Sequence, residues 1–226
     1  MNLTIIIPTL NEAQAIGRLI DRLLTADREK IEIIVVDGGS EDETIAIADK
    51  AGIQVLHCDC SRAKQMNAGA DAAKHDILYF VHADTLPPIG YLADGAHYLN
   101  QGYDAACYRS KFESSHLMLR LNEFFTKFYW LVARGGDQSL FIRKSTFEAL
   151  GKFDENMVIM EEYPLIAELM KTKKMALIPK SIAICTRKYK ERSWLKVSRA
   201  NYSAFKLYRK GVPSEKIKKR YLELLG

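Results

Sequence analysis

The sequence has no apolar run as long as the roughly 18 residues that a membrane-spanning helix needs. Its start shows neither a basic stretch nor a small-residue cleavage site, so we expect no signal peptide. The chain has four cysteines, and no second Cys or His pair stands near Cys58 and Cys60 at zinc spacing. These absences favour a cytoplasmic protein with ordinary thiols.

Repeats, low-complexity stretches and linkers are also absent, and 226 residues with 48% hydrophobic and 27% charged side chains suit one α/β domain. The net charge of +5 is uneven: residues 187–226 hold 13 Lys and Arg against 3 Asp and Glu, whereas residues 1–186 hold 20 against 25. We therefore predict a main domain, residues 1–186, and a basic helical extension, residues 187–226.

The basic extension favours an anionic partner, either a phosphorylated ligand or a membrane surface, which would place the protein at the inner membrane face. A solvated helix surface is the alternative. We expect no nucleic-acid partner. Apolar stripes on the two basic helices would pack on the main domain or on a second subunit, so a homodimer is one expectation.

In its first hundred residues the chain alternates predicted strands and helices. We expect strands at 3–8, 31–37, 54–57 and 77–82. Asn11 is predicted to cap the first helix, residues 40–43 (SEDE) to form a capping box for a helix ending at Gly52, and residues 62–74 to form a third helix. This order indicates a largely parallel sheet covered by helices.

Beyond Asp84 the pattern is less regular. We expect helices at 91–100, 116–134 and 160–170, strands at 105–109, 139–142, 176–178 and 182–184, and two final basic helices at 193–210 and 214–225, the last capped by Ser214.

Acidic side chains stand where predicted strands or loops end. Asp37 follows one apolar run, Asp84 follows another, and Glu161 and Glu162 come some eighty residues later. Ligand chemistry in α/β proteins is placed at such strand ends. The spacing suggests one site for a nucleotide, a divalent cation and an acceptor hydroxyl.

Several motifs resemble those of family 2 glycosyltransferases in order and spacing. They are residues 6–12 (IIPTLNE), 35–44 (VVDGGSEDET), 62–69 (RAKQMNAG), 81–84 (VHAD), 136–141 (GDQSLF) and 208–212 (YRKGV). Together they look like a short bacterial subgroup named from arsenosugar biosynthesis or radical-enzyme neighbourhoods. The resemblance implies the α/β GT-A nucleotide-diphospho-sugar transferase fold, with a mixed, mostly parallel sheet flanked by helices.

The resemblance also implies a nucleotide-binding set: Pro8, Thr9, Glu12, Asp37, Arg62, His82 and Asp84. In this set Asp37 would accept a hydrogen bond from a uracil N–H, and Arg62 would face the nucleotide. Other readings remain open: Asp37 could cap the turn after its strand, Arg62 could form a surface ion pair, and Glu12 could satisfy a helix dipole.

Asp84 is the predicted metal ligand. A divalent ion, Mn²⁺ or Mg²⁺, would neutralise the charge that develops on a diphosphate leaving group, and it needs only one or two protein oxygens when the diphosphate and water complete its shell. The sequence has His82 where the family commonly has the first acid of an Asp-x-Asp motif, so Asp84 would ligate alone and His82 would contact the ribose or phosphate.

Glu161 and Glu162 stand where the family has a Glu-Asp pair whose second member is the catalytic base. We predict Glu162 as the base and Glu161 as the second candidate, because an attacking hydroxyl must lose its proton to a nearby carboxylate. Two acids at a helix start are the structural alternative. The resemblance assigns sugar, acceptor or diphosphate contacts to Asp137, Gln138, Arg187 and Lys188.

The sequence thus predicts a metal-dependent, inverting glycosyltransferase that uses a nucleoside diphosphate sugar, with a UDP-sugar favoured, and a small-molecule or lipid-linked acceptor. One rival is a nucleotidyltransferase, which would normally carry a Gly-rich basic loop after the first strand. The other is a non-catalytic nucleotide-binding or peripheral membrane protein of the same fold. A dehydrogenase is poorly supported because no Gly-x-Gly-x-x-Gly follows the first strand.

Overall fold

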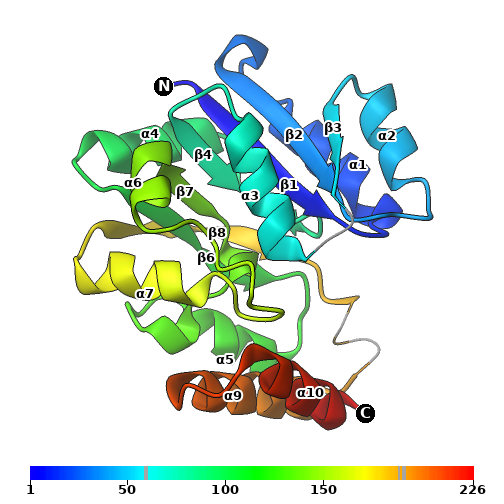
Figure 1. The fold of residues 1–226 in the computed structure, drawn as a ribbon, viewed down its shortest axis with the longest axis vertical. Helices are drawn as coiled ribbons and strands as arrows, with labels where there is room; N and C mark the ends of the chain where they lie inside the picture. Colours follow the sequence, from blue (N-terminus) through cyan, green and yellow to red (C-terminus); the bar gives the residue numbers. More distant parts are fainter. Residues whose placement is uncertain (59–60, 188, 190–191) are drawn as a thin grey trace.

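A computed structural model describes residues 1–58, 61–187, 189 and 192–226, and in these residues one sheet lies between two layers of helices (Figure 1). The strands are β1 (Leu3–Thr9), β2 (Ile31–Asp37), β3 (Gln54–His57), β4 (Ile77–Phe80), β5 (Thr85–Leu86), β6 (Ala105–Phe112), β7 (Leu140–Arg143) and β8 (Met175–Ile184). The α-helices are α1 (Ala13–Leu23), α2 (Thr44–Lys50), α3 (Arg62–Ala72), α4 (Tyr91–Asn100), α5 (Leu117–Phe125), α6 (Lys144–Ala149), α7 (Tyr163–Lys171), α9 (Trp194–Arg209) and α10 (Ser214–Leu225). Short 3₁₀ turns are η1 (Arg28–Lys30), η2 (Leu131–Ala133) and η3 (Gly136–Gln138).

The sheet has the order β3-β2-β1-β4-β7-β6-β8-β5. Strands β1 to β4 run parallel to one another, whereas β7 is antiparallel to both of its neighbours, β4 and β6. The β4–β7 register pairs Phe80 with Leu140, so β7 begins beside the end of β4. The predicted mixed α/β sheet flanked by helices is confirmed.

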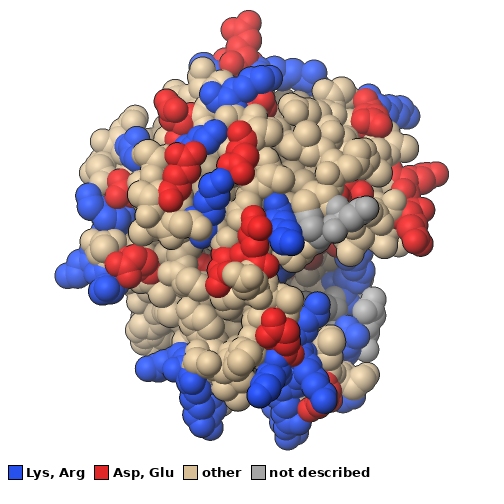
Figure 2. All heavy atoms as spheres, viewed as in Figure 1, with Lys and Arg blue, Asp and Glu red and all other residues tan. Residues whose placement is uncertain are grey.

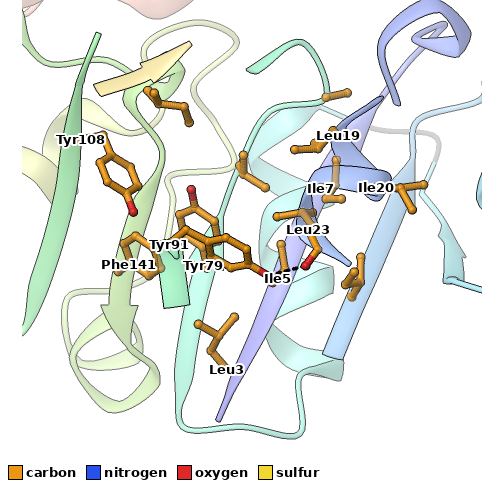
Figure 3. Packing of buried hydrophobic residues seen from close by; sticks show 14 of the residues in the cluster. Leu3, Ile5, Ile7, Leu19, Ile20, Leu23, Tyr79, Tyr91, Tyr108 and Phe141 are labelled. Carbon is orange, nitrogen blue, oxygen red and sulfur yellow. Dashed lines mark hydrogen bonds between the residues drawn. The ribbon is translucent and has the colours of Figure 1, made fainter. Parts of the chain in front are cut away.

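Alternate residues of the buried strands pack on opposite faces of the sheet, as the two-residue period requires. One face of β1 contributes Leu3, Ile5 and Ile7 to a cluster with α1 and α4 (Figure 3). Ile6, on the other face, packs with residues of α3, α6 and α7. Both faces are therefore covered, which explains why these strands read as continuous apolar runs.

Aromatic rings fill the middle of the sheet. Tyr79 of β4 and Phe141 of β7 stack with ring centroids 3.8 Å apart, and Tyr91 of α4 stacks on Tyr79 from 5.7 Å (Figure 3). The Tyr91 hydroxyl donates to the Leu23 carbonyl at 2.9 Å. This contact satisfies the polar end of a buried ring and joins α4 to the end of α1.

Two predicted helix caps are wrong. Asn11 has a positive φ of 55° and lies before the N-cap position of α1, and its side chain accepts from the Glu41 N–H instead. The Asp42 carboxylate accepts from the Ala13 N–H at 3.0 Å, so the loop after β2 supplies the cap of α1. Helix α2 begins at Thr44, after the expected capping box, because Asp42 also binds the Thr44 N–H.

Later boundaries differ as well. The expected helix 116–134 ends at Phe125, where the Thr126 hydroxyl bonds back to the Glu123 carbonyl. Helix α7 starts at Tyr163 rather than 160, since Met160 has a positive φ of 62°. The two short strands predicted after 175 are one strand, β8. Ser214 is the first residue of α10 and binds Val158 N–H and Asn156 O, so it is not the cap.

The cysteine prediction is wrong at one position: Cys58 is disulfide-bonded, while Cys107 and Cys185 are free thiols. Cys60 lies outside the described residues.

Helices α9 and α10 pack on each other at one end of the molecule (Figure 1). Met160, before α7, joins Ala204 and Ile217 in a small buried cluster that ties both helices to the main body. Within the described ranges no helix is long and apolar enough to cross a membrane. The division at residue 187 stays a prediction.

Helix α3 approaches the sheet at Gly69, where an added Cβ would lie 2.5 Å from Ile6 Cγ2 and 3.0 Å from Val36 Cγ2. We expect Gly69→Ala to lower the free energy of unfolding by about 1–3 kcal/mol, because the buried strands cannot move aside. The matched control is Gly17→Ala in α1, where the nearest atom would be 3.5 Å away. That change should stabilise the protein by about 0.5–1 kcal/mol. Urea unfolding midpoints measure both, and equal effects would contradict the close approach.

Candidate active site

The ends of β1 and β2 meet in a hydrogen-bonded turn around Asp37. Its fully buried carboxylate accepts from the Gly39 N–H at 2.8 Å, the Ser40 N–H at 2.8 Å, the Ser40 hydroxyl at 2.5 Å and the Thr9 hydroxyl at 3.3 Å. Burial alone would raise the pKa of Asp37, but these hydrogen bonds outweigh it and lower the pKa. The four donors use the roughly four acceptor positions of a carboxylate. The structure therefore shows the turn-capping alternative.

Gln65 of α3 fixes the same turn from the other side. Its amide nitrogen donates to the Thr9 carbonyl at 2.8 Å and to the Val36 carbonyl at 2.9 Å. A Cβ on Gly38 would lie 2.7 Å from that nitrogen, so the position needs a glycine. Sequence reasoning did not single out Gln65, although it lies within the motif of residues 62–69.

Glu12 is paired with a residue from the far end of the chain. Its two carboxylate oxygens each lie 3.0 Å from Nη2 of Arg187. Burial raises the pKa of Glu12, Arg187 lowers it in part, and the negative charge of Asp84 raises it again. The structure thus places Glu12, Asp84 and Arg187 near one another, while Pro8 is buried within β1. Lys188 lies outside the described residues.

Asp84 is half-buried, and its carboxylate makes no hydrogen bond or ion pair with any described residue in the structure. A carboxylate held in this way at a strand end suits a divalent cation that takes one protein oxygen. No group of three or more His, Cys, Asp or Glu that could hold a metal occurs among the described residues. A cation at Asp84 would therefore draw most of its ligands from a bound diphosphate and water.

Arg62, the first residue of α3, faces two consecutive carboxylates. It forms an ion pair with Glu161, whose side chain is only 3% exposed. Burial would lower the pKa of Arg62, but Glu161 and Glu162 raise it overall. Burial would likewise raise the pKa of Glu161, yet the charge and hydrogen bond of Arg62 lower it. The ion pair that was the alternative reading of Arg62 is present, and it is part-buried, since Glu161 is buried and Arg62 is exposed.

In Glu162 the effects that raise the pKa outweigh those that lower it. Burial raises its pKa, the charge of Glu161 raises it further, and Arg62 compensates only in part. Its Oε1 accepts from the Gly136 N–H at 2.8 Å, whereas its buried Oε2 has no hydrogen-bond partner among the described residues. Glu162 is also the N-cap residue of α7, but its side chain makes no capping hydrogen bond. Glu162 thus has one oxygen fixed by a hydrogen bond and one buried oxygen without a partner among the described residues.

Gly136 brings His82 and Glu162 into one place. Because β7 is antiparallel to β4, the turn before β7 lies beside the loop after β4. An added Cβ at Gly136 would be 2.6 Å from the His82 ring and 3.3 Å from Glu162 Oε1. Asp137 follows, with its Oδ1 3.7 Å from His82 Nδ1. The sequence indicated Gly136 as the first residue of the motif 136–141, but its close approach to His82 depends on strand pairing that spacing does not reveal.

A pocket of about 740 Å³ opens beside this group. Arg62, Glu162 and Asp137 line its polar end, and Phe125, Trp130, Tyr202 and Phe205 are among the aromatic residues along its walls. Gln138 also borders the pocket, but its amide is held by the Ala133 carbonyl at 2.8 Å and the Ser110 hydroxyl at 3.2 Å. These bonds give Gln138 a structural role in shaping the wall. The aromatic wall was not predicted as part of the site.

Comparison with known proteins gives a consistent picture. The sequence profile described as Glycosyl transferase family 2 matches residues 4–144. A PGL/p-HBAD biosynthesis glycosyltransferase of Mycobacterium bovis is 36% identical over 88 residues, which cover 36% of this chain and 34% of that protein. A dolichyl-phosphate hexose transferase of Haloferax volcanii is 28% identical over 54% of this chain and 53% of that protein. The chain thus spans about a third to a half of these relatives.

Solved structures share the fold at low sequence identity. TarS of S. aureus in complex with UDP has a TM-score of 0.68 and 16% identity over 100% of this chain and 71% of that chain. A Pyrobaculum calidifontis mannosyltransferase in complex with GDP-Man and Mn²⁺ has a TM-score of 0.69 and 19% identity over 90% and 61%. Glucosyl-3-phosphoglycerate synthase of Mycobacterium tuberculosis in complex with Mn²⁺, UDP and glucosyl-3-phosphoglycerate has a TM-score of 0.67 and 19% identity, over 94% of this chain and 81% of that chain. These similarities show the GT-A-like fold.

The Asp37 turn gives a testable pH dependence. Because the pKa of Asp37 is lowered on folding, its ionised form stabilises the protein above the unfolded-state pKa, and this stabilisation is lost as the pH falls through the folded-state pKa. We expect Asp37→Asn to lower the free energy of unfolding by about 1–3 kcal/mol near neutral pH, and the difference from wild type to shrink below pH ~4. Asp49→Asn on the exposed side of α2 is the control and should change little. A pH-independent difference would contradict this account.

Proposed function

Since the chain belongs to glycosyl transferase family 2, we propose that it transfers a sugar from a nucleoside diphosphate donor to a hydroxyl acceptor, with inversion at the anomeric carbon. The observation that carries the proposal is Glu162, a buried carboxylate with a raised pKa and an unpartnered Oε2 at the wall of a 740 Å³ pocket. A raised pKa brings a carboxylate closer to the range in which a general base works.

The chemical step is a single displacement. Glu162 takes the proton of the acceptor hydroxyl while that oxygen attacks the anomeric carbon. The bond from that carbon to the diphosphate oxygen breaks, and the nucleoside diphosphate leaves with the electron pair. The Gly136 N–H holds Oε1 of Glu162, so Oε2 is the oxygen that would take the proton. Attack from the side opposite the leaving group inverts the configuration.

The donor would bind along the strand ends of β1, β2 and β4. Asp37 fixes the turn that receives the base, for which we favour uracil, and Thr9 belongs to the same turn. His82 and Asp84 follow β4, between this turn and Glu162. A Mn²⁺ or Mg²⁺ ion at Asp84 would neutralise the departing diphosphate. Arg187 would add a positive charge near it.

The acceptor would occupy the aromatic pocket. Its polar end at Arg62 and its apolar walls suit a molecule with a polar head and an apolar body, so we favour a lipid-linked acceptor over a small polar one. Relatives named for undecaprenyl-phosphate and dolichyl-phosphate sugar transfer support this choice. We also propose membership of the short arsenosugar-type subgroup on its motifs. The cytoplasmic location, membrane contact through the basic C-terminus and homodimer stay predictions.

The donor site can be tested by binding. We expect a uridine diphosphate ligand to raise the melting temperature more with Mn²⁺ or Mg²⁺ than without, because the metal would join Asp84 to the diphosphate. Asp84→Ala should abolish the increment due to metal. Asp37→Ala should weaken nucleotide binding in both conditions because the turn would lose its organising carboxylate. Calorimetric titration measures both variants, and unchanged metal dependence in Asp84→Ala would refute the assignment. A panel of nucleoside diphosphate sugars in the same assay identifies the donor.

The base can be tested by turnover. Glu162→Gln keeps size and most hydrogen bonding but cannot accept a proton, so donor affinity should survive while kcat falls about 10²–10⁴-fold. Glu161→Gln, which cannot remove the base if our choice is correct, should lose less. The reverse ranking would make Glu161 the base, and full activity in both variants would favour the structural alternative, two acids at the start of α7.

The pH profile gives an independent check on the same residue. The acidic limb of kcat/KM reports the pKa of the free base. Glu161→Gln removes the negative charge that raises the pKa of Glu162, so the limb should move to lower pH. Arg62→Met removes the compensating positive charge, so the limb should move to higher pH. Shifts in the same direction would show that another group controls the profile.

A further inference from the structure

The stretch from α5 to η2 exposes more large apolar side chains than a solvated surface would. Leu117 is 75% exposed and Trp130 is 50% exposed. The exposed apolar members, which we call the aromatic segment, are Leu117, Leu121, Phe124, Phe125, Phe128, Tyr129, Trp130 and Val132. Their rings pack on one another, with Phe128 and Trp130 stacked at 4.6 Å. Large exposed apolar patches mark interaction surfaces.

Buried hydrogen bonds hold the aromatic segment in place. The guanidinium of Arg134, 3% exposed, donates to the Thr126 carbonyl at 2.5 Å and to the Phe128 carbonyl at 3.0 Å. The Glu123 carboxylate accepts from the Phe112 N–H at 2.7 Å, and the Tyr129 hydroxyl donates to the Met175 carbonyl. The exposed rings are thus presented by a fixed backbone, which favours a binding surface over a loose loop.

Helix α9 continues this surface across the pocket. Leu195 and Tyr202 are 68% and 65% exposed, and exposed Arg199 and Lys206 share their face because all four lie at helical spacing. Phe125 and Trp130 line the pocket from one side and Tyr202 from the other. Lys and Arg gather at this end of the molecule, over α9 and α10 (Figure 2). The aromatic segment and α9 therefore border one pocket.

The charges on these two stretches decide between possible occupants. Helix α9 carries Lys196, Arg199, Lys206 and Arg209 and no acid. In residues 117–132 the one acid, Glu123, is engaged by the backbone, while Arg120 and Lys127 are exposed. A second copy docked on this face would bring like charges together. An anionic bilayer supplies the opposite charge, and Trp, Tyr, Lys and Arg are the side chains that prefer its interface.

We propose that this face docks on an anionic phospholipid bilayer, with the aromatic segment at the boundary between headgroups and acyl chains and the pocket opening towards the lipid. The proposal deepens the proposed function, because it gives a lipid-linked acceptor a direct path to Glu162. Ring insertion adds an apolar component to the attraction of the basic residues. That component does not weaken with salt as the electrostatic one does.

The test uses tryptophan fluorescence, since the chain has two tryptophans. Trp194→Phe leaves Trp130 as the reporter, and Trp130→Phe leaves Trp194. With vesicles of phosphatidylglycerol and phosphatidylcholine in equal parts, Trp130 emission should shift to shorter wavelength and be quenched by lipids brominated on the acyl chain. Trp194 should respond less. Vesicle binding without quenching of Trp130 would overturn the insertion and leave electrostatic attraction alone.

Variants in co-sedimentation complete the test. The triple variant Leu117→Ser, Phe124→Ser and Trp130→Ser should lower the partition coefficient at least about tenfold, equal to 1.4 kcal/mol. Ile89→Ser, which changes an apolar side chain 72% exposed before α4, should bind as wild type. Thermal unfolding checks that each variant is folded. If the folded triple variant partitions as wild type does, the bilayer proposal is refuted. If light scattering shows a dimer mass for wild type and a monomer mass for the triple variant, the bilayer proposal is also refuted, and a second copy of the chain is favoured as the occupant.

Failure of this proposal can be distinguished from failure of the proposed function. Glu162→Gln should bind vesicles as wild type does, because Glu162 lies inside the pocket. Vesicle binding by a protein without transfer activity on any donor would refute the function and keep the docking surface. Activity on a water-soluble acceptor with no vesicle binding would do the reverse.

Discussion

One positive charge, that of Arg62, lies beside two buried carboxylates and compensates them unequally. The electrostatics of the site depend on this inequality. Arg62 lies at the start of α3 and pairs with Glu161, so Glu161 keeps its charge and Glu162 is left with incomplete compensation. Two adjacent acids in unequal surroundings acquire pKa values that move apart. The two neighbouring acids are thereby made unequal: Glu161 is held in its charged form, and Glu162, which lines the pocket, has a raised pKa.

Much of the fold could be predicted because its signals are local. Apolar runs at β1 and β2, helical spacing in α1, and Ser193 before α9 all lead to the observed elements. The errors arise where partners distant in sequence decide. Asp42, in the next loop, caps α1, and Thr126, at the end of α5, accepts a hydrogen bond from the Ser110 N–H of β6. A pattern in one segment cannot report a contact that another segment supplies.

In the candidate site, too, local sequence signals indicated residues, whereas the contacts between distant segments could not be predicted. The ends of predicted strands and loops indicated Asp37, Asp84, Glu161 and Glu162, and the family resemblance added Thr9 and His82. Sequence could not show that the Asp37 carboxylate accepts hydrogen bonds from its own turn or that Glu12 pairs with Arg187. Nor could it show that Gly136 lies against the His82 ring. The aromatic pocket wall was read as one face of a long helix, because its apolar spacing is helical and only tertiary contacts break the helix at Phe125.

The antiparallel strand β7 also separates the two halves of the site in a way that bears on how such enzymes diversify. The chain leaves the sheet after Phe112 of β6 and returns at Leu140 of β7, next to Phe80. Residues 113–139 are therefore an insertion that lies outside the sheet, between two neighbouring strands. Its length and composition can change without altering the register of β1, β2 and β4. A change in this insertion can therefore reshape the pocket that it borders while the strand ends of β1, β2 and β4 keep their positions.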